Sequence, residues 1–306
     1  MDVGGTTTAA GLVAGDGRVL AAVQGPTHAG GPGGALATLV ELIERIRAEA
    51  PPRGLEAAAI GIGVPGTVDA ETGTIGAEAH YVPELAHVPL AATVSGRLRL
   101  PAFVDNDVNA LALGELMFGA GRGAASLVLL ALGTGVGGGI ILEGRLVRGR
   151  GGYGGELGHV PIDFDGRPCI CGGRGCLKTY VSGTDIALEG SRRLGREVTA
   201  PGVFLLAAAG EATAGAIVTE VIAALGAGLA VIVNGLNPER LLLAGCVAES
   251  LRPLEPRIRA ACARHAFAGA CATTAMEIIS LNKGSAVRGG AALAHYEIHR
   301  REGARA

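Results

Sequence analysis

Apolar residues along this chain follow two patterns: short runs typical of strands and longer segments with helical spacing. The first two runs, residues 9–13 and 18–23, flank the turn Ala14-Gly15-Asp16-Gly17 and predict a hairpin. A helix is predicted over residues 36–50, where the apolar positions share one face: Leu36, Leu39, Val40, Ile43 and Ile46. The chain therefore opens with a hairpin followed by an amphipathic helix.

The rest of the chain alternates between the same two patterns. Further strands are predicted at residues 57–64, 101–104, 127–132, 139–142, 241–244 and 277–281. Further helices are predicted at residues 108–118, 186–194, 203–209, 214–233, 251–264 and 289–301, and residues 149–183 form an irregular segment rich in Gly and Cys. Because strands alternate with helices and a hairpin opens each half, we expect an α/β fold of two similarly designed halves.

Composition narrows the class of protein. The 306 residues suffice for two lobes with a sizeable core, and the net charge of -2 gives no footprint for nucleic acid. The charge-free window 124–142 contains a glycine cluster, and the window 221–233 is too short to span a bilayer. No charged segment followed by an apolar one opens the chain. We expect a soluble cytoplasmic protein that binds neither nucleic acid nor membrane.

The first motif with chemical meaning is Asp2-Val3-Gly4-Gly5-Thr6-Thr7. Glycines at a hairpin bend let backbone N–H groups approach phosphate oxygens, and threonine hydroxyls add donors. A carboxylate at the end of the preceding strand can hold the Mg²⁺ that accompanies ATP. The alternative is a simple hairpin turn.

A second glycine cluster spans residues 133–139. Gly133, Gly135 and Gly138 satisfy the dinucleotide fingerprint, but that fingerprint requires a helix after the glycines. Here the apolar run Ile140-Ile141-Leu142 follows and predicts a returning strand. We therefore expect a second glycine hairpin, which would hold the nucleotide phosphates from the other side.

The third motif, Asp105-Asn106-Asp107-Val108-Asn109, lies where a predicted strand ends and a helix begins. Sheets of this class place ligands at that position. A carboxylate here can accept the proton of a sugar hydroxyl as its oxygen attacks a phosphoryl group, and Asn106 can bind neighbouring hydroxyls. The alternative is that these side chains only cap the helix.

The most specific motif combines His159 with Cys169, Cys171 and Cys176. Three thiolates and one imidazole form a closed tetrahedral Zn²⁺ site of the structural kind. The alternatives are unpaired core cysteines, or a zinc ribbon for nucleic acid, which the few nearby cations disfavour. Glu156 precedes His159 by three residues, so a helical turn would place both on one face, with Glu156 free to bind sugar hydroxyls.

These motifs, in this order, resemble the ROK family of sugar kinases and sugar-responsive repressors, and the resemblance covers essentially the whole chain. It implies the actin-like ATPase (ribonuclease H-like) fold, two α/β lobes with a cleft between them. The N-terminal lobe would be residues 1–112, completed by a C-terminal helix over 289–306. The C-terminal lobe would be residues 113–288, and it would contain the zinc loop at 155–178. The resemblance also implies a homodimer or a higher homo-oligomer.

The resemblance assigns roles to individual residues. Asp107 would be the catalytic base, and the sugar would contact Gly66, Asn106, Asp107, Glu156, His159 and Lys178. The nucleotide would be held by Asp2, Gly4, Gly5, Thr6, Thr7, Gly133, Thr134, Gly135 and Gly245. His159, Cys169, Cys171 and Cys176 would bind Zn²⁺, so the expected ligands are ATP, Mg²⁺, Zn²⁺ and a small-molecule sugar.

Three departures from the family pattern bear on the substrate. Lys178 stands where the family has a sugar-binding Glu, and the loop Ala79-His80-Tyr81-Val82-Pro83 stands where the family often has a Pro-Asn pair. Only one residue precedes Asp2, where the family carries several apolar residues, so either the natural start lies upstream or the first strand is cut short.

The function expected from these features is ATP-dependent phosphorylation of a hexose, at the 6-hydroxyl of glucose or a glucose-like sugar. One alternative is an amino-sugar kinase acting on N-acetylglucosamine, N-acetylmannosamine or 3-amino-3-deoxyglucose. A sugar-responsive regulator is a further alternative, but repressors of the family carry a helix-turn-helix before the first motif, for which we see no room in this sequence.

Overall fold

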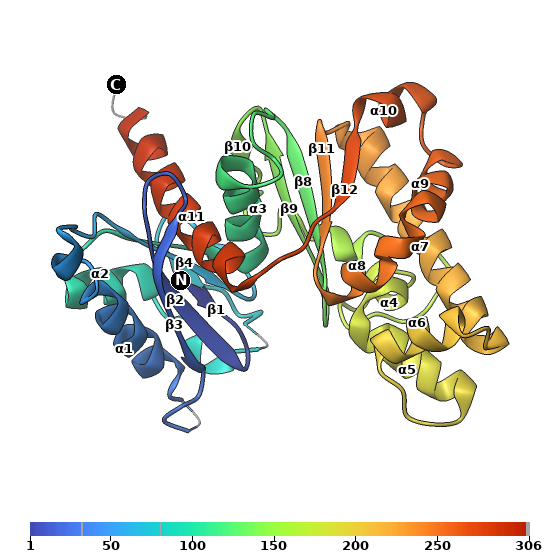
Figure 1. Cartoon of the computed structure of the whole chain (residues 1–306), viewed down its shortest axis with the longest axis horizontal. Coiled ribbons are helices and arrows are strands. Elements are labelled where there is room, and N and C mark those ends of the chain that lie inside the picture. Colours follow the sequence, from blue (N-terminus) through green and yellow to red (C-terminus); the bar gives the residue numbers. More distant parts are fainter. Residues whose placement is uncertain (32, 80, 304–306) are drawn as a thin grey trace.

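The chain folds into two lobes, each built on a mixed five-stranded sheet (Figure 1). The structure is a computed structural model that describes residues 1–31, 33–79 and 81–303. Of Lys283, within the last of these ranges, it describes the backbone but not the side chain. His80 and residues 304–306, which the sequence predictions include, lie outside the described residues.

The N-terminal sheet has the strand order β3-β2-β1-β4-β7. The strands are β1 (Asp2–Val3), β2 (Thr7–Val13), β3 (Val19–Pro26), β4 (Ile60–Val64) and β7 (Ala102–Asn106). The first three run antiparallel, as the hairpin prediction requires, while β4 lies parallel to both β1 and β7. The carboxyl ends of β1, β4 and β7 therefore meet at one edge of the sheet.

The C-terminal sheet repeats this design, with the order β10-β9-β8-β11-β12. Its strands are β8 (Leu127–Leu132), β9 (Val136–Leu142), β10 (Arg145–Leu146), β11 (Arg240–Ala244) and β12 (Ala275–Ile278). Again an antiparallel hairpin, β8–β9, leads into parallel strands, β8, β11 and β12. The two halves expected from the sequence thus share one topology.

Helices cover the N-terminal sheet. They are α1 (Ala35–Arg47), α2 (Leu90–Leu98), α3 (Asp107–Phe118) and the C-terminal α11 (Lys283–Gly303), with 3-10 turns η1 (Pro51–Arg53) and η2 (Pro83–Leu85) and a small hairpin of β5 (Val68–Asp69) and β6 (Thr74–Ile75). Figure 1 shows the chain crossing back from the C-terminal lobe so that α11 lies beside the N-terminal sheet. One continuous core cluster contains the buried faces of α1, α2 and β4.

The remaining helices belong to the C-terminal lobe. They are α4 (Lys178–Val181), α5 (Gly183–Leu194), α6 (Ala200–Ala208), α7 (Ala212–Leu236), α8 (Cys246–Leu251), α9 (Glu255–Ala263) and α10 (Ala268–Thr273), with 3-10 turns η3 (Leu157–His159) and η4 (Arg252–Leu254). Within the described residues, α7 alone is long and apolar enough to cross a membrane. Its apolar window is 67% buried inside the lobe, so packing in the core accounts for its composition.

The predicted helix over 251–264 is wrong as a single element. It consists of the end of α8, the 3-10 turn η4 and α9. Pro253 and Pro256 lie in the first turns of η4 and α9. Since proline has no N–H and fixes its φ angle, it starts a helix readily and interrupts one that is already running.

Glycines set the close packing between α11, α3 and β4. A β-carbon on Gly61 would overlap the carbonyl oxygen of Gly290, and one on Gly114 would lie 2.9 Å from the α-carbon of Gly289. Backbones can approach this closely only without side chains. The C-terminal helix thereby braces the strand and the helix that border the site described below.

Strand β1 is short. The buried amino group of Met1 donates a hydrogen bond to the carbonyl oxygen of Gly61 at 2.7 Å, and burial lowers its pKa to about 6. A cavity of about 410 Å³ adjoins Met1, lined by β2, by α11 and by the residues before β4. The cavity lies away from the carboxylates and glycine hairpins that the sequence singled out.

Candidate active site

Asp2 and Asp107 lie on either side of Gly63. Asp2 pairs with Gly63 across β1 and β4, and a β-carbon on Gly63 would stand 3.1 Å from the α-carbon of Asp107. The sheet therefore brings together two carboxylates that are far apart in the sequence. The fold places one in the two-residue strand β1 and the other at the start of α3.

The two carboxylates influence each other. Burial, followed by repulsion from Asp2 and a smaller repulsion from Glu156, raises the pKa of Asp107 to about 7. Burial also raises the pKa of Asp2. A carboxyl group that titrates near neutral pH is suited to general-base work, because it can both take and release a proton at working pH.

Asn106 caps α3. Its side-chain oxygen accepts hydrogen bonds from the backbone N–H groups of Val108 at 2.9 Å and Asn109 at 3.2 Å, while its amide donates to the carbonyl oxygen of Gly66 at 3.1 Å. The capping alternative therefore holds for this residue, and the same bonds join it to Gly66. Gly66 has a φ of 99° and lies against the backbone of Glu78, so β4, α3 and the segment after β6 converge here.

The first glycine motif forms the bend between β1 and β2. The N–H of Gly4 donates to the carbonyl oxygen of Thr7 at 3.0 Å. Thr27, which the sequence did not single out, fixes this bend: its hydroxyl donates to the carbonyl oxygen of Gly4 at 2.5 Å and lies 3.0 Å from the Thr8 hydroxyl. Gly5, Thr6 and the exposed Thr7 lie at the bend and the start of β2, where their backbone and hydroxyl groups can meet a phosphate.

The second glycine cluster is a hairpin, as predicted. Leu132 pairs with Val136, and Gly133, Thr134 and Gly135 form the loop between β8 and β9.

The later glycines of the cluster serve packing. A β-carbon on Gly139 would lie 2.7 Å from the β-carbon of Ala112 in α3, and one on Gly138 would overlap the carbonyl oxygen of Gly155. The cluster thus joins the second hairpin to Asp107 through α3 and to Glu156 through Gly155.

Gly245 adjoins the second hairpin. It links β11 to α8 with a φ of 102°, and a β-carbon there would lie 2.5 Å from the carbonyl oxygen of Leu132. The N–H of Gly183, at the start of α5, donates to the carbonyl oxygen of Gly133 at 2.7 Å. The three predicted nucleotide-binding segments therefore divide into one bend in the N-terminal lobe and two adjacent turns in the C-terminal lobe.

Glu156 and His159 are linked by the predicted helical turn. The N–H of His159 donates to the carbonyl oxygen of Glu156 at 3.0 Å, and the turn is the 3-10 element η3. Gly155 reaches this turn with a φ of 97°. Glu156 therefore lies near Asp107, close enough to raise its pKa, while His159 belongs to the metal cluster.

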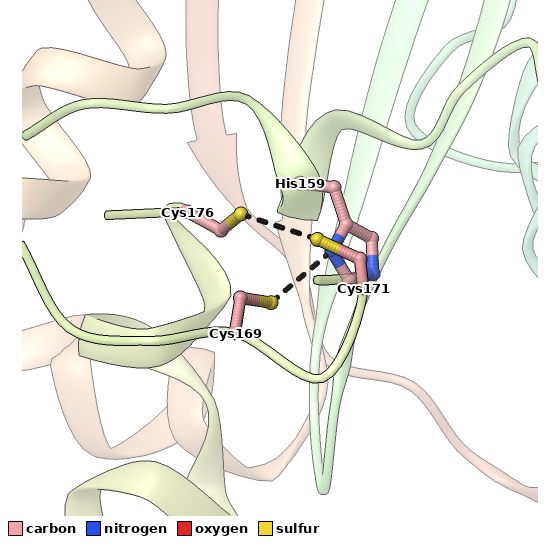
Figure 2. A group of neighbouring side chains, drawn as sticks. All are labelled: His159, Cys169, Cys171 and Cys176. Atoms are coloured by element: carbon pink, nitrogen blue, oxygen red, sulfur yellow. Dashed lines mark hydrogen bonds between the residues drawn. The ribbon is translucent and has the colours of Figure 1, made fainter. Parts of the chain in front are cut away.

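His159, Cys169, Cys171 and Cys176 form one cluster, with all ligand atoms within 4.8 Å of one another (Figure 2). The Cys169 sulfur lies 3.4 Å from Nδ1 of His159, and the sulfurs of Cys171 and Cys176 are 3.6 Å apart. A tetrahedral Zn²⁺ with bonds of about 2.3 Å to sulfur and 2.0 Å to nitrogen separates its ligands by roughly 3.5–3.8 Å. These two separations and the donor set fit Zn²⁺.

The pKa values of two of the thiols are shifted in opposite directions. Burial, then the neighbouring sulfurs, raises the pKa of Cys176 to about 12, whereas the backbone N–H of Gly173 lowers that of Cys171. Zn²⁺ would offset this repulsion and hold the loop 155–178 together. With four protein ligands the site would be structural, leaving no open position for catalysis.

The positive charge of Lys178 is paired with a carboxylate. Its ammonium group forms an ion pair with Asp185 at 3.1 Å, and Asp185 also accepts from the Ser182 hydroxyl at the start of α5. The interpretation that Lys178 simply replaces an acceptor by a donor therefore needs amending, because the positive charge is already balanced. The backbone before Lys178 stays close to the metal loop, since the N–H of Leu177 donates to the carbonyl oxygen of Val160 at 2.9 Å.

Comparison with known proteins identifies the family. A family model described as "ROK family" matches residues 1–297. This chain belongs to the ROK family. The ROK hexokinase from Thermus thermophilus has the same fold, with a TM-score of 0.85, 31% identity and 98% of each chain covered. A ROK family glucokinase from Streptomyces griseus, in complex with glucose and AMPPNP, aligns with a TM-score of 0.77 and 30% identity over 96% of this chain and 97% of that one. The fold is thus the actin-like ATPase fold expected from the sequence.

Curated ROK relatives include both kinases and repressors. The glucokinase of Halalkalibacterium halodurans is 33% identical over 283 residues, 85% of this chain and 84% of that protein. The glucokinase of Thermotoga maritima is 41% identical over 187 residues, 61% of this chain but only 57% of that protein. A xylose repressor of Caldicellulosiruptor bescii is 34% identical over 226 residues, 68% of this chain and 55% of that protein.

One part of the site in this ROK protein has no signal in the sequence. Arg148, after β10, binds Asp105 of β7 at 2.6 Å and Glu297 of α11 at 2.5 Å. The carboxylate side chains are 3% and 1% exposed, so the guanidinium joins the lobes through a buried ion pair. Asp105 is the immediate neighbour of Asn106 and also accepts from the Asn109 amide at 2.9 Å, so this contact fixes the end of β7, directly before Asp107.

Proposed function

We propose that this protein is an ATP-dependent sugar kinase that phosphorylates a hexose hydroxyl, at the 6-position of glucose or a glucose-like sugar. The observation that carries the proposal is Asp107, whose pKa is raised to about 7, which lies near Asp2, and whose helix α3 packs against the strand of the second glycine hairpin. The kinase names and the nucleotide and sugar ligands of the ROK relatives agree with it.

The proposed reaction uses Asp107 as general base. As the sugar oxygen attacks the terminal phosphorus of ATP, its proton passes to the Asp107 carboxylate, and ADP leaves on the opposite side. The N–H groups of Gly4 and Gly133 close their own turns, so the phosphates would be bound by the backbone N–H groups of Gly5, Thr6, Thr134 and Gly135, with Gly245 beside the second hairpin. Asp2 would hold Mg²⁺, which neutralises charge on the phosphate oxygens when bound.

Glu156 and Gly66 frame the sugar. Glu156 is the carboxylate that lies between Asp107 and the metal loop, where an acceptor can bind a pair of sugar hydroxyls. Asn106 is held by its cap and by Gly66, so it offers a fixed amide beside Asp107. Zn²⁺ on His159 and the three cysteines would keep Glu156 in place through η3.

The substrate is tested with a panel under one set of conditions. We would measure ADP release in Mg²⁺ and ATP with glucose, mannose, glucosamine, N-acetylglucosamine, N-acetylmannosamine and 3-amino-3-deoxyglucose, and locate the phosphate on the product by NMR. Preferred turnover of glucose, with phosphate at the 6-position, is expected. An amino sugar turned over well while glucose is poor would replace the glucose assignment, and no sugar-dependent ADP release would overturn the kinase proposal.

A regulator is the second candidate, because repressors occur among the ROK relatives. Sugar binding alone does not separate the two functions, since both classes would bind a sugar. Turnover separates them: a kinase releases ADP when the sugar is added, whereas a regulator would bind the sugar without releasing ADP.

A further inference from the structure

Tyr81 bridges the two glycine hairpins. Its β-carbon lies 3.1 Å, and its backbone oxygen 3.3 Å, from where a β-carbon on Gly5 would stand. Its hydroxyl lies 3.7 Å from the corresponding position on Gly135. The ring therefore reaches from the bend of the N-terminal lobe to the hairpin of the C-terminal lobe, and its side chain is only half buried, with 54% exposure.

The hairpins themselves are poor in cations. Residues 2–8 and 133–139 contain neither lysine nor arginine, so their donors are backbone N–H groups and threonine hydroxyls. Phosphoryl transfer spreads negative charge over three equatorial oxygens, and each well-placed donor lowers the barrier. A phenol hydroxyl beside Gly135, on a side chain that also contacts the bend at Gly5, supplies one more neutral donor.

We propose that Tyr81 is a further catalytic residue, whose hydroxyl donates a hydrogen bond to the phosphoryl group as it moves from ATP to the sugar. The inference rests on the proposed kinase function. The bond from phosphorus to the ADP oxygen breaks, the bond to the sugar oxygen forms, and the sugar proton goes to Asp107. Tyr81 keeps its own proton throughout and acts only as a donor.

Tyr153 provides a matched comparison. It is exposed to a similar degree, 56%, and it also contacts the segment that carries Tyr81. Its hydroxyl, however, donates to the Glu78 carboxylate at 2.8 Å, and Glu78 also accepts from the Thr67 hydroxyl at 2.7 Å. The Tyr153 hydroxyl is thus engaged in a contact between loops, whereas the Tyr81 hydroxyl lies beside a phosphate-binding hairpin.

The test removes one oxygen atom from each tyrosine. Tyr81→Phe and Tyr153→Phe are compared with the wild type for kcat, for KM of ATP and for KM of the preferred sugar, with thermal unfolding as a check on folding. Loss of one transition-state donor predicts a kcat about 10- to 100-fold lower for Tyr81→Phe, with sugar KM within about twofold. Tyr153→Phe is expected to keep kcat within about twofold.

The pH profile shows whether the loss in Tyr81→Phe arises from a disturbed Asp107. Because Tyr81→Phe leaves Asp107 in place, the fall in kcat/KM below pH 7 is expected at the same pH as in the wild type. Unchanged kcat in Tyr81→Phe, a change confined to sugar KM, or an equal loss in Tyr153→Phe would each overturn the proposal. Silence of the wild type on every sugar would instead overturn the proposed function, and this inference with it.

Discussion

At the scale of single residues, the site depends on placing carboxylates where they repel one another. Asp2 and Asp107 come within reach because Gly63 between them has no side chain. Burial and repulsion raise the pKa of Asp107 to about 7, and both effects disfavour its charged form. The unfavourable burial of a charged carboxylate therefore occurs at the residue that carries the proposed chemistry.

Removing the base should abolish turnover without loss of the fold. We expect Asp107→Ala to lower kcat by about 10²- to 10⁴-fold, the usual contribution of a general base. Circular dichroism and zinc content should match those of the wild type. Turnover near the wild-type level in this variant would show that another group takes the proton.

The pH dependence of activity has a defined direction. A base acts when it is deprotonated, so kcat/KM should fall as the pH drops below about 7 and should level off above it. Removing the charge of Asp2 in Asp2→Asn lowers the pKa of Asp107, so the remaining activity should lose its acid limb at a lower pH. A limb that does not move in this variant would contradict the proposed repulsion.

The same pKa predicts an effect on stability. The folded-state pKa of Asp107 is above the unfolded value, so its contribution to stability is fully present below about pH 4 and is lost as the pH rises through about 7. Asp107→Asn should therefore raise the melting temperature at pH 8, and the gain should shrink towards pH 4. An equal shift at both pH values would mean that ionisation is not the cause.

At the scale of elements, the glycine cluster at residues 133–139 serves helix packing as well as the proposed phosphate binding. Gly133 and Gly135 belong to the loop, whereas Gly137 and Gly139 let α3 lie against the strand. We expect Gly139→Ala to displace α3, because the new β-carbon would stand 2.7 Å from Ala112, and hence to lower kcat through Asp107. The control is Gly215→Ala in α7, where the new β-carbon would have no neighbouring group within 4 Å, and it should leave kcat unchanged.

The metal loop makes a separate prediction. Cys171→Ser should remove stoichiometric Zn²⁺ and lower the melting temperature together, since Zn²⁺ binding and the folding of such a loop are coupled. The matched control is Cys246→Ser, an exposed cysteine outside the cluster, which should keep the metal. Zinc retained at one equivalent in Cys171→Ser would contradict the ligand assignment.

Many of these elements could be predicted from the sequence because their signals are local. The glycine hairpins, the cysteine spacing and the turn from Glu156 to His159 are all short-range patterns, and the structure contains each of them. Pro253 and Pro256, which divide residues 251–264, are themselves a local signal that two helices start there. The partner of Lys178 was not predictable, because no rule of spacing links a metal loop to Asp185 on the next helix.

At the scale of the whole molecule, a buried ion pair joins the lobes. Arg148 connects Asp105 of the N-terminal sheet with Glu297 of the C-terminal helix. Arg148 and Glu297 are 149 residues apart in the sequence. Such long-range partners leave no mark on local sequence patterns, so the sequence could predict the two halves but not what holds them together.

Breaking this pair should be costly. Arg148→Met removes the cation that two buried carboxylates share, and leaves Asp105 only the Asn109 amide and the Asn106 N–H, and Glu297 only Arg300 and Arg301. We expect a loss of about 3–5 kcal/mol in the free energy of unfolding by urea titration. Arg18→Met breaks the exposed pair with Asp16 and should have no measurable effect. Equal stability of the two variants would mean that the lobes do not depend on this contact.

The lobes matter because each supplies half of the proposed site. The first hairpin and Asp107 come from one lobe, and the second hairpin, Glu156 and the metal loop from the other. The most direct test is the rate of ADP release in saturating Mg²⁺ and ATP, measured with and without glucose on the same preparation. The account predicts that glucose raises this rate at least about 100-fold and that Asp107→Ala removes the increase. A rate that no hexose or amino sugar changes would contradict it.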